Sequence, residues 1–173
     1  MCIMGIVCFL MVCCFAAVML IASGGGVEPP IYKMEGEETT MHVDGGSRYR
    51  YPAEDVRNLA KIMQAESGID WPDWAVLCIG EVVLNRVGSP LFPDSIFEVL
   101  HQGPPIQYAP VWELGWKELE PKEQYIDLAI RLLDGERVLK NPRVIWQALF
   151  PQGERTVLTY YDRALNSTTY FCE

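Results

Sequence analysis

The sequence predicts a mainly helical domain of α+β class, with a small strand or coil element at its end, behind an apolar N-terminal segment. Three observations lead to this prediction. Half of the 173 residues are hydrophobic, which is enough to form a packed core. After residue 50, apolar residues recur at helical spacing in several segments. Short runs of β-branched and aromatic residues follow near the end of the chain and read as loops or strands packed on helices.

The charge of the chain lies entirely after its apolar beginning. The first charged residue is Glu28, and the net charge is −9. Because such a surface repels phosphate backbones and contains no run of Lys or Arg, we expect no binding to nucleic acid. The two histidines, His42 and His101, lack metal-ligand spacing, so we expect no metal site and no other cofactor.

The N-terminal segment from Cys2 to Ala22 is continuously apolar. At about 1.5 Å per residue, a helix of this length spans roughly 31 Å, the thickness of a bilayer core. We therefore expect residues 1–23 to form a transmembrane anchor, with a single span and the folded domain outside the cytoplasm. A signal segment that is cleaved near Ser23, which would leave a secreted protein, remains the alternative.

Residues 24–50 are rich in glycine and acidic residues and show no hydrophobic period, so we expect a flexible acidic linker. The folded domain is then expected to occupy residues 51–173. Its two cysteines, Cys78 and Cys172, could pair outside the cytoplasm, but the sequence does not show whether their geometry allows a disulfide.

Two helices are expected to open the domain. The first begins at Tyr51-Pro52 and ends at Gly68, with proline at an early helical position. One of its faces carries apolar residues at helical spacing: Val56, Leu59, Ala60 and Met63. The second runs from about Asp73 to Val87 and is apolar on nearly every side, so we expect it to be central and buried.

Two further helices follow. Ser95 opens a capping box, S-x-x-E, which predicts a short helix to about His101. An irregular stretch then leads to Pro121, where the last helix is expected to begin, and Gly135 supplies its C-terminal signal. The apolar face of that helix is expected at Ile126, Ala129, Ile130 and Leu133.

Glu66 is the residue that the pattern singles out for chemistry. It follows Met63 by three positions and Leu59 by seven, so it projects from the buried face at the C-terminal end of the first helix. Burial and the negative end of the helix dipole both raise the pKa of a carboxyl group. A carboxylic acid that stays protonated near neutral pH can serve as a general acid. The alternative is a structural ion pair with an arginine such as Arg86.

Four short motifs carry a family resemblance: AESG at 65–68, IGEVVLNRV at 79–87, SPLFPDSI at 89–96 and QY at 107–108. Together they resemble the SleB-type cell-wall hydrolases, the catalytic-domain family of spore-cortex-lytic enzymes, over about Leu59 to Cys172. The resemblance implies a lysozyme-like fold. It also implies cleavage of the MurNAc–GlcNAc bond of peptidoglycan, typically as a lytic transglycosylase with Glu66 as the catalytic acid.

The resemblance also suggests substrate-binding residues. Gln107 and Tyr108 correspond to an element that lines the cleft opposite the acid, although Tyr108 could equally be part of the core. Gln147 is expected to reach the cleft from a strand. Asp70, the carboxylate nearest to Glu66 in sequence, completes the substrate-binding set.

Departures from the family pattern concern the second helix and the end of the chain. Glu81 lies in the middle of the most apolar helix, so we expect it to have a structural partner, such as an arginine, or to face the cleft. We expect Asn85-Arg86 to act as a structural tie. A family His-x-Phe near the C-terminus is replaced by Thr169-Tyr170-Phe171.

The expected partners are therefore peptidoglycan glycan strands, as the substrate, and the membrane, through the N-terminal helix. No protein partner is indicated. Three other functions remain open: a muramidase that adds water with a second carboxylate such as Asp70 or Asp94, a non-catalytic module that binds the cell wall, and a structural subunit of a secretion or conjugation apparatus.

Overall fold

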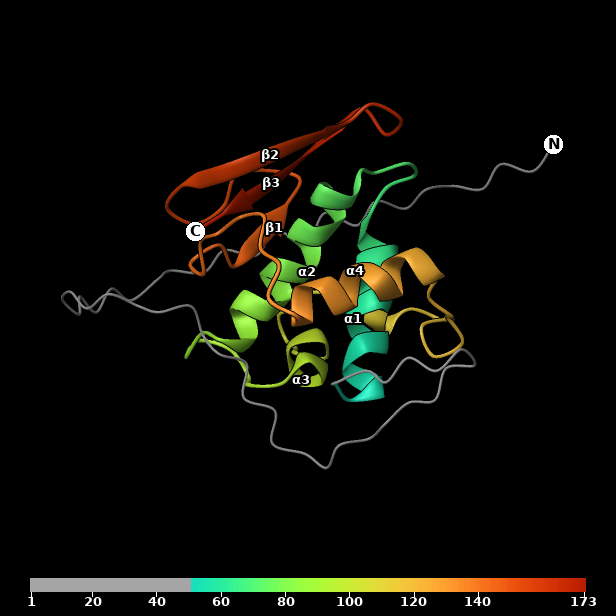
Figure 1. Ribbon diagram of the computed structural model, residues 1–173. Helices are drawn as coiled ribbons and strands as arrows, with labels where there is room; N and C mark the ends of the chain where they lie inside the picture. Colours follow the sequence, from blue (N-terminus) through green and yellow to red (C-terminus); the bar gives the residue numbers. More distant parts are fainter. Residues whose placement is uncertain (1–50) are drawn as a thin grey trace.

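The computed structural model describes residues 51–173 (Figure 1). The anchor expected at 1–23 and the linker expected at 24–50 lie outside these residues. Within the described part, no helix combines the length and the apolar character that a membrane span requires. This part is mostly helical with a small antiparallel sheet, as predicted.

The two opening helices pack against each other and form much of the core. Helix α1 spans Ala53–Glu66 and helix α2 spans Asp73–Val87. The four predicted apolar positions of α1 are buried, and α2 is buried along nearly its whole length. At Gly80 an added Cβ would lie 2.4 Å from Leu132 Cδ1. The absence of a side chain there lets α2 come close to its helical neighbours.

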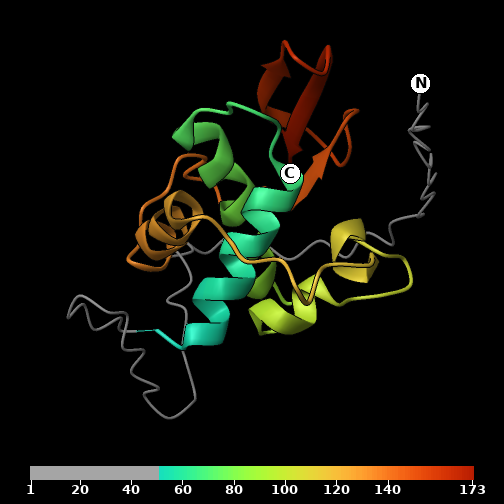
Figure 2. The ribbon, with the colours of Figure 1, turned by 90° about the vertical axis from the view of Figure 1, so that its right-hand side faces the viewer.

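Two short helices follow. Helix α3, Ile96–Leu100, has the predicted cap: Ser95 Oγ accepts a hydrogen bond from the backbone N–H of Glu98 and donates one to the Glu98 carboxylate at 2.8 Å. The 3-10 helix η1, Ala109–Trp112, lies in the stretch expected to be irregular. It lies to one side of α1, together with α3 (Figure 2).

Helix α4 spans Glu123–Leu133, and its buried face differs from the predicted one. The buried positions are Tyr125, Leu128, Ala129 and Leu132. Of the predicted set, Ile126, Ile130 and Leu133 are only partly buried, at the margin of the same core. The buried stripe includes Tyr125, an aromatic residue that an aliphatic count omits. Its ring is buried while its hydroxyl lies 3.2 Å from Ser67 Oγ.

The end of the chain forms a three-stranded sheet beside α2 (Figure 1). Strand β1 is Trp146–Ala148, β2 is Thr156–Asp162 and β3 is Ser167–Cys172. The order is β1-β3-β2, so the last strand is central, and both pairings are antiparallel. The side chain of Phe171 joins Cys78 and Val82 of α2 in a second hydrophobic cluster. Helix α2 is thus covered by helices and by the sheet.

Cys78 and Cys172 are both buried and both free, so the structure contains no disulfide between them. Cys78 Sγ lies 3.2 Å from the carbonyl oxygen of Trp74. Burial, reinforced by the charge of Glu81, raises the pKa of the Cys78 thiol to about 12. A thiol of this kind is not a nucleophile at neutral pH.

Candidate active site

Glu66 is the last residue of α1 and is partly buried. Burial raises the pKa of its carboxyl group from 4.5 to about 7. The nearby Arg86 guanidinium lowers this pKa and the Glu113 carboxylate raises it, but both effects are smaller than that of burial. Near neutral pH a large share of Glu66 is therefore protonated and able to donate a proton.

The chain after Glu66 is held from the side of the sheet. The indole N–H of Trp71 donates a hydrogen bond to Asp162 Oδ2 at 2.6 Å. Asp162 ends β2, and its other carboxylate oxygen accepts the backbone N–H groups of Ala164 and Leu165. These three bonds keep the pKa of Asp162 below its usual range, with the Trp71 bond as the largest cause. A charged acceptor therefore holds the loop that follows the acid.

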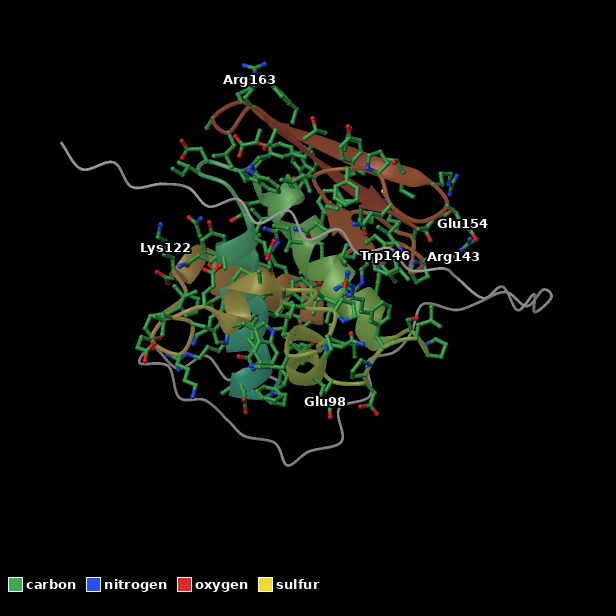
Figure 3. The ribbon with its side chains drawn as sticks, turned by 180° about the vertical axis from the view of Figure 1, so that it is seen from behind. Glu98, Lys122, Arg143, Trp146, Glu154 and Arg163 are labelled. Carbon is green, nitrogen blue, oxygen red and sulfur yellow. The ribbon has the colours of Figure 1, made fainter. Side chains whose placement is uncertain are left out.

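Arg86, near the end of α2, is only 3% exposed. Its Nε donates to the carbonyl oxygen of Ile145 at 2.7 Å. Its guanidinium carbon lies 5.2 Å from the ring centroid of Phe92, 5.0 Å from that of Tyr108 and 5.7 Å from that of Trp146. Figure 3 shows Trp146 at the base of the sheet, on the side of the helices. Cation–π contacts on several sides thus fix this guanidinium.

No ion pair between described residues includes Glu66 or Arg86. The ion-pair alternative for Glu66 therefore finds no support in the structure. Arg86 nevertheless is the structural tie that the sequence predicted, because its Nε holds the backbone just before β1. Asn85 does the same, since its Nδ2 donates to the carbonyl oxygens of Asn141 and Val144.

Tyr108 precedes η1 and is 3% exposed. Burial raises the pKa of its phenol, while Arg86 lowers it and Glu66 raises it by a smaller amount. Its hydroxyl oxygen is buried and has no hydrogen-bond partner. The ring of Tyr108 belongs to the core, and its hydroxyl lies within electrostatic range of Glu66. Its substrate-binding role stays a prediction.

The remaining predicted site residues make no hydrogen bond with Glu66 among the described residues. Asp70 is exposed, in a left-handed backbone conformation with φ of 61°, and none of the charges that shift the pKa of Glu66 belongs to it. Gln107 is partly buried, and no hydrogen bond between described residues joins it to Glu66. In β1, it is Trp146 and not Gln147 that contacts Arg86. Neighbouring residues in a strand point to opposite faces, so the side chain of Gln147 points to the other face of the sheet from Trp146. Gln147 pairs with Phe171 of β3, and its Oε1 is buried without a hydrogen-bond partner.

Glu81 has backbone partners rather than the arginine we suggested. Its carboxylate accepts the N–H groups of Val138, Leu139 and Lys140 at 2.7, 2.9 and 3.0 Å. Three donors from one turn satisfy a buried carboxylate without a cation, because each carboxylate oxygen offers two lone pairs. The role of Glu81 is to fix the turn between α4 and β1.

Two functional features were not predicted from the sequence. Glu113 follows η1 in an exposed position and is the carboxylate that acts on Glu66. It lies in a stretch without hydrophobic period, so no sequence signal relates it to Glu66. The Trp71–Asp162 bond likewise joins segments 91 residues apart.

Comparison with models of protein families gives a match to part of the domain. Residues 72–147 match the family model described as Cell Wall Hydrolase. The matched range contains Arg86, Tyr108, Glu113 and Trp146, and Glu66 lies just before it. No curated protein and no solved structure matches the chain significantly.

Proposed function

On the premise that residues 72–147 form a cell wall hydrolase domain of SleB type, we propose that this protein cleaves the MurNAc–GlcNAc bond of peptidoglycan as a lytic transglycosylase. The family match supports peptidoglycan as the substrate. The observation that carries the proposed mechanism is the pKa of Glu66, which burial raises to about 7.

One carboxyl group is sufficient for this reaction. The protonated Glu66 gives its proton to the glycosidic oxygen, and the electron pair of the C1–O bond moves to that oxygen. The resulting carboxylate then removes the proton of the 6-hydroxyl of the same MurNAc residue, whose oxygen bonds to C1. The products are a GlcNAc-terminated strand and a 1,6-anhydro-MurNAc end. A group with a pKa near the working pH suits both steps.

A lysozyme-like arrangement is part of the proposal. Glu66 ends a central helix at the point where the helical part meets the sheet, since the loop after it is bonded to Asp162 of β2. The aromatic rings of Phe92, Tyr108 and Trp146 gather around Arg86 of α2. A glycan strand would bind across this junction, between the sheet and η1.

The second candidate function is a muramidase, which adds water in place of the 6-hydroxyl. It requires a second carboxylate, and Glu113 is the one within electrostatic range of Glu66. Glu113 is exposed, so its carboxylate is accessible to a water molecule that it could activate. This observation favours Glu113 over Asp70 for that role.

The location of the protein is proposed on the sequence alone. We place the domain outside the cytoplasm behind a single-span anchor at residues 1–23, with secretion after signal cleavage as the alternative. Either location would bring the domain to the peptidoglycan.

The test uses the full chain, kept in solution with a mild detergent and incubated with isolated peptidoglycan. Glu66→Gln removes the proton donor, and Glu118→Gln is the matched control because Glu118 is an exposed carboxylate. Mass spectrometry of the soluble fragments identifies the sugar ends that cleavage produces. We expect anhydro-muramyl ends from the wild type and the control, and none from Glu66→Gln.

Other outcomes separate the alternatives. Reducing muramic acid ends would show a muramidase. No release by a folded wild-type chain that still sediments with peptidoglycan would show a binding module. A folded chain that neither releases fragments nor sediments with peptidoglycan would point to a structural subunit.

A further inference from the structure

Two buried polar atoms near Glu66 lack hydrogen-bond partners. They are Nη1 of Arg86 and the hydroxyl oxygen of Tyr108. The two side chains are neighbours, because the guanidinium carbon lies 5.0 Å from the Tyr108 ring centroid. Leaving buried donors unpaired destabilises a fold, so a pair of them beside a candidate catalytic group calls for a functional reason.

The guanidinium is held so that it cannot turn away to find another partner. Nε is bonded to the carbonyl oxygen of Ile145, and the rings of Phe92, Tyr108 and Trp146 surround the group. A free donor on a fixed, buried cation is an anion-binding group. Glu66 lies within electrostatic range of Arg86 and becomes an anion when it loses its proton.

We propose that Arg86 and Tyr108 form a holder for the carboxylate that Glu66 becomes after it has given up its proton. This inference rests on the proposed function. When Glu66 protonates the glycosidic oxygen and the C1–O electron pair leaves with it, the new carboxylate accepts hydrogen bonds from Arg86 Nη1 and from the Tyr108 hydroxyl. When the 6-hydroxyl adds to C1, its proton returns to Glu66 and the holder empties.

The separation between Glu66 and Arg86 is what makes such a holder useful. A direct ion pair would keep Glu66 ionised at neutral pH and leave it unable to act as an acid. The charged groups that act on Glu66 are Arg86 from α2 and Glu113 after η1, and Glu66 in turn acts on Tyr108 before η1. Arg86 stabilises the ionised form of Glu66 and Glu113 destabilises it, so Glu66 can take up both its protonated and its ionised form. Arg86 and Tyr108 are positioning residues in this scheme.

The sharpest test is Tyr108→Phe in the full chain. The substitution removes a hydroxyl that makes no hydrogen bond in the structure, so the fold should persist. We expect kcat for release of peptidoglycan fragments to fall about tenfold with KM unchanged, since one hydrogen bond to a charged group is lost. We also expect the titration midpoint of Glu66 to rise. The matched control is Tyr161→Phe, whose hydroxyl bonds Asn166 at the end of the β2–β3 hairpin.

The midpoint is measured by NMR on protein labelled with ¹³C at the glutamate carboxyl groups, with Glu66→Gln to assign the signal. A second variant, Arg86→Met, removes the cation and should raise the Glu66 midpoint by about one pH unit or more. Circular dichroism confirms that each variant is folded before it is titrated.

The outcomes are distinguishable from those of the proposed function. Raised midpoints in Tyr108→Phe and Arg86→Met support the holder even if no variant, nor the wild type, releases fragments; in that case only the proposed function fails. Unchanged midpoints in folded variants overturn the holder. A rise in KM with kcat unchanged in Tyr108→Phe also overturns it, because Tyr108 would then bind the substrate.

Discussion

The indole N–H of Trp71 donates a 2.6 Å hydrogen bond to Asp162 Oδ2, joining the loop after α1 to the end of β2. The bond passes directly beside Gly68, where an added Cβ would lie 2.1 Å from Asp162 Oδ2 and 2.3 Å from Trp71 Nε1. The contact that fixes the loop after Glu66 therefore requires a residue without a side chain at position 68.

Gly68→Ala should break the Trp71–Asp162 bond. We expect the free energy of unfolding to fall by about 1–3 kcal/mol, the usual effect of forcing an atom into a filled space. Fragment release should fall as well, because the loop beside Glu66 loses its anchor. Urea denaturation and a peptidoglycan assay measure the two effects. Gly103→Ala is the control, since its Cβ would make only ordinary contacts at 3.6 and 3.8 Å. Equal effects of both substitutions would contradict the prediction.

The raised pKa of Glu66 makes stability depend on pH. In the unfolded chain the carboxyl group titrates near 4.5, and in the folded chain near 7, so the folded state binds more protons between these values. The free energy of unfolding therefore falls as the pH rises from 4.5 to 7. The full effect is on the order of 3 kcal/mol, from about 1.36 kcal/mol per pH unit.

Glu66→Gln removes this dependence. We expect the variant to match the wild type near pH 4 and to exceed it by up to about 3 kcal/mol at pH 8, since no charge has to be buried. Urea denaturation at pH 4, 6 and 8 measures the difference. A constant difference across this range would mean that Glu66 titrates normally in the folded protein.

Glu113→Gln separates the two candidate reactions. Removing this charge lowers the pKa of Glu66, because Glu113 raises it. The pH at which activity falls on the alkaline side should therefore move down. As a transglycosylase the variant should keep kcat within about tenfold at the shifted optimum, whereas a muramidase with Glu113 as base would lose about 10²–10⁴-fold. Glu118→Gln should change neither quantity.

Glu81→Gln tests the buried carboxylate of α2. The amide offers one oxygen in place of two and adds donors where three backbone N–H groups already point. We expect a loss of about 1–3 kcal/mol in the free energy of unfolding and faster hydrogen exchange at residues 138–140. For comparison, Glu136→Gln breaks the exposed pair with Arg131 and should cost less than about 1 kcal/mol. Similar losses in both variants would refute the special role of Glu81.

Local sequence patterns predicted much of the helical part. Helix α2 has the predicted bounds because Pro72 precedes it, Gly88 follows it and its apolar residues leave no polar face. The cap of α3 was predicted because Ser95 and Glu98 lie within one turn of each other. The buried face of α4 differs from the predicted one because it includes Tyr125. The ring of Tyr125 is buried in the core, while its hydroxyl contacts the polar side chain of Ser67.

Contacts between distant segments were not predictable in the same way. The sheet order depends on pairing β3 between two earlier strands, and short aromatic runs do not encode their partners. The raised pKa of Glu66 was predictable because helical periodicity and the helix end are local features. The sequence named Arg86 only as one possible ion-pair partner of Glu66, and the effect of Glu113, which lies in another element, is shown only by the assembled domain.

Because the raised pKa of Glu66 depends on burial, the side chain acquires it only when the chain folds. While the chain is being made and before it folds, Glu66 is an ordinary glutamate with a pKa near 4.5, ionised at neutral pH and unable to protonate a sugar oxygen. Only when folding has buried the same side chain does its pKa rise to about 7, so that it can donate a proton near neutral pH. On the proposed function, the catalytic acid is thus latent in the newly made polypeptide and is generated by folding.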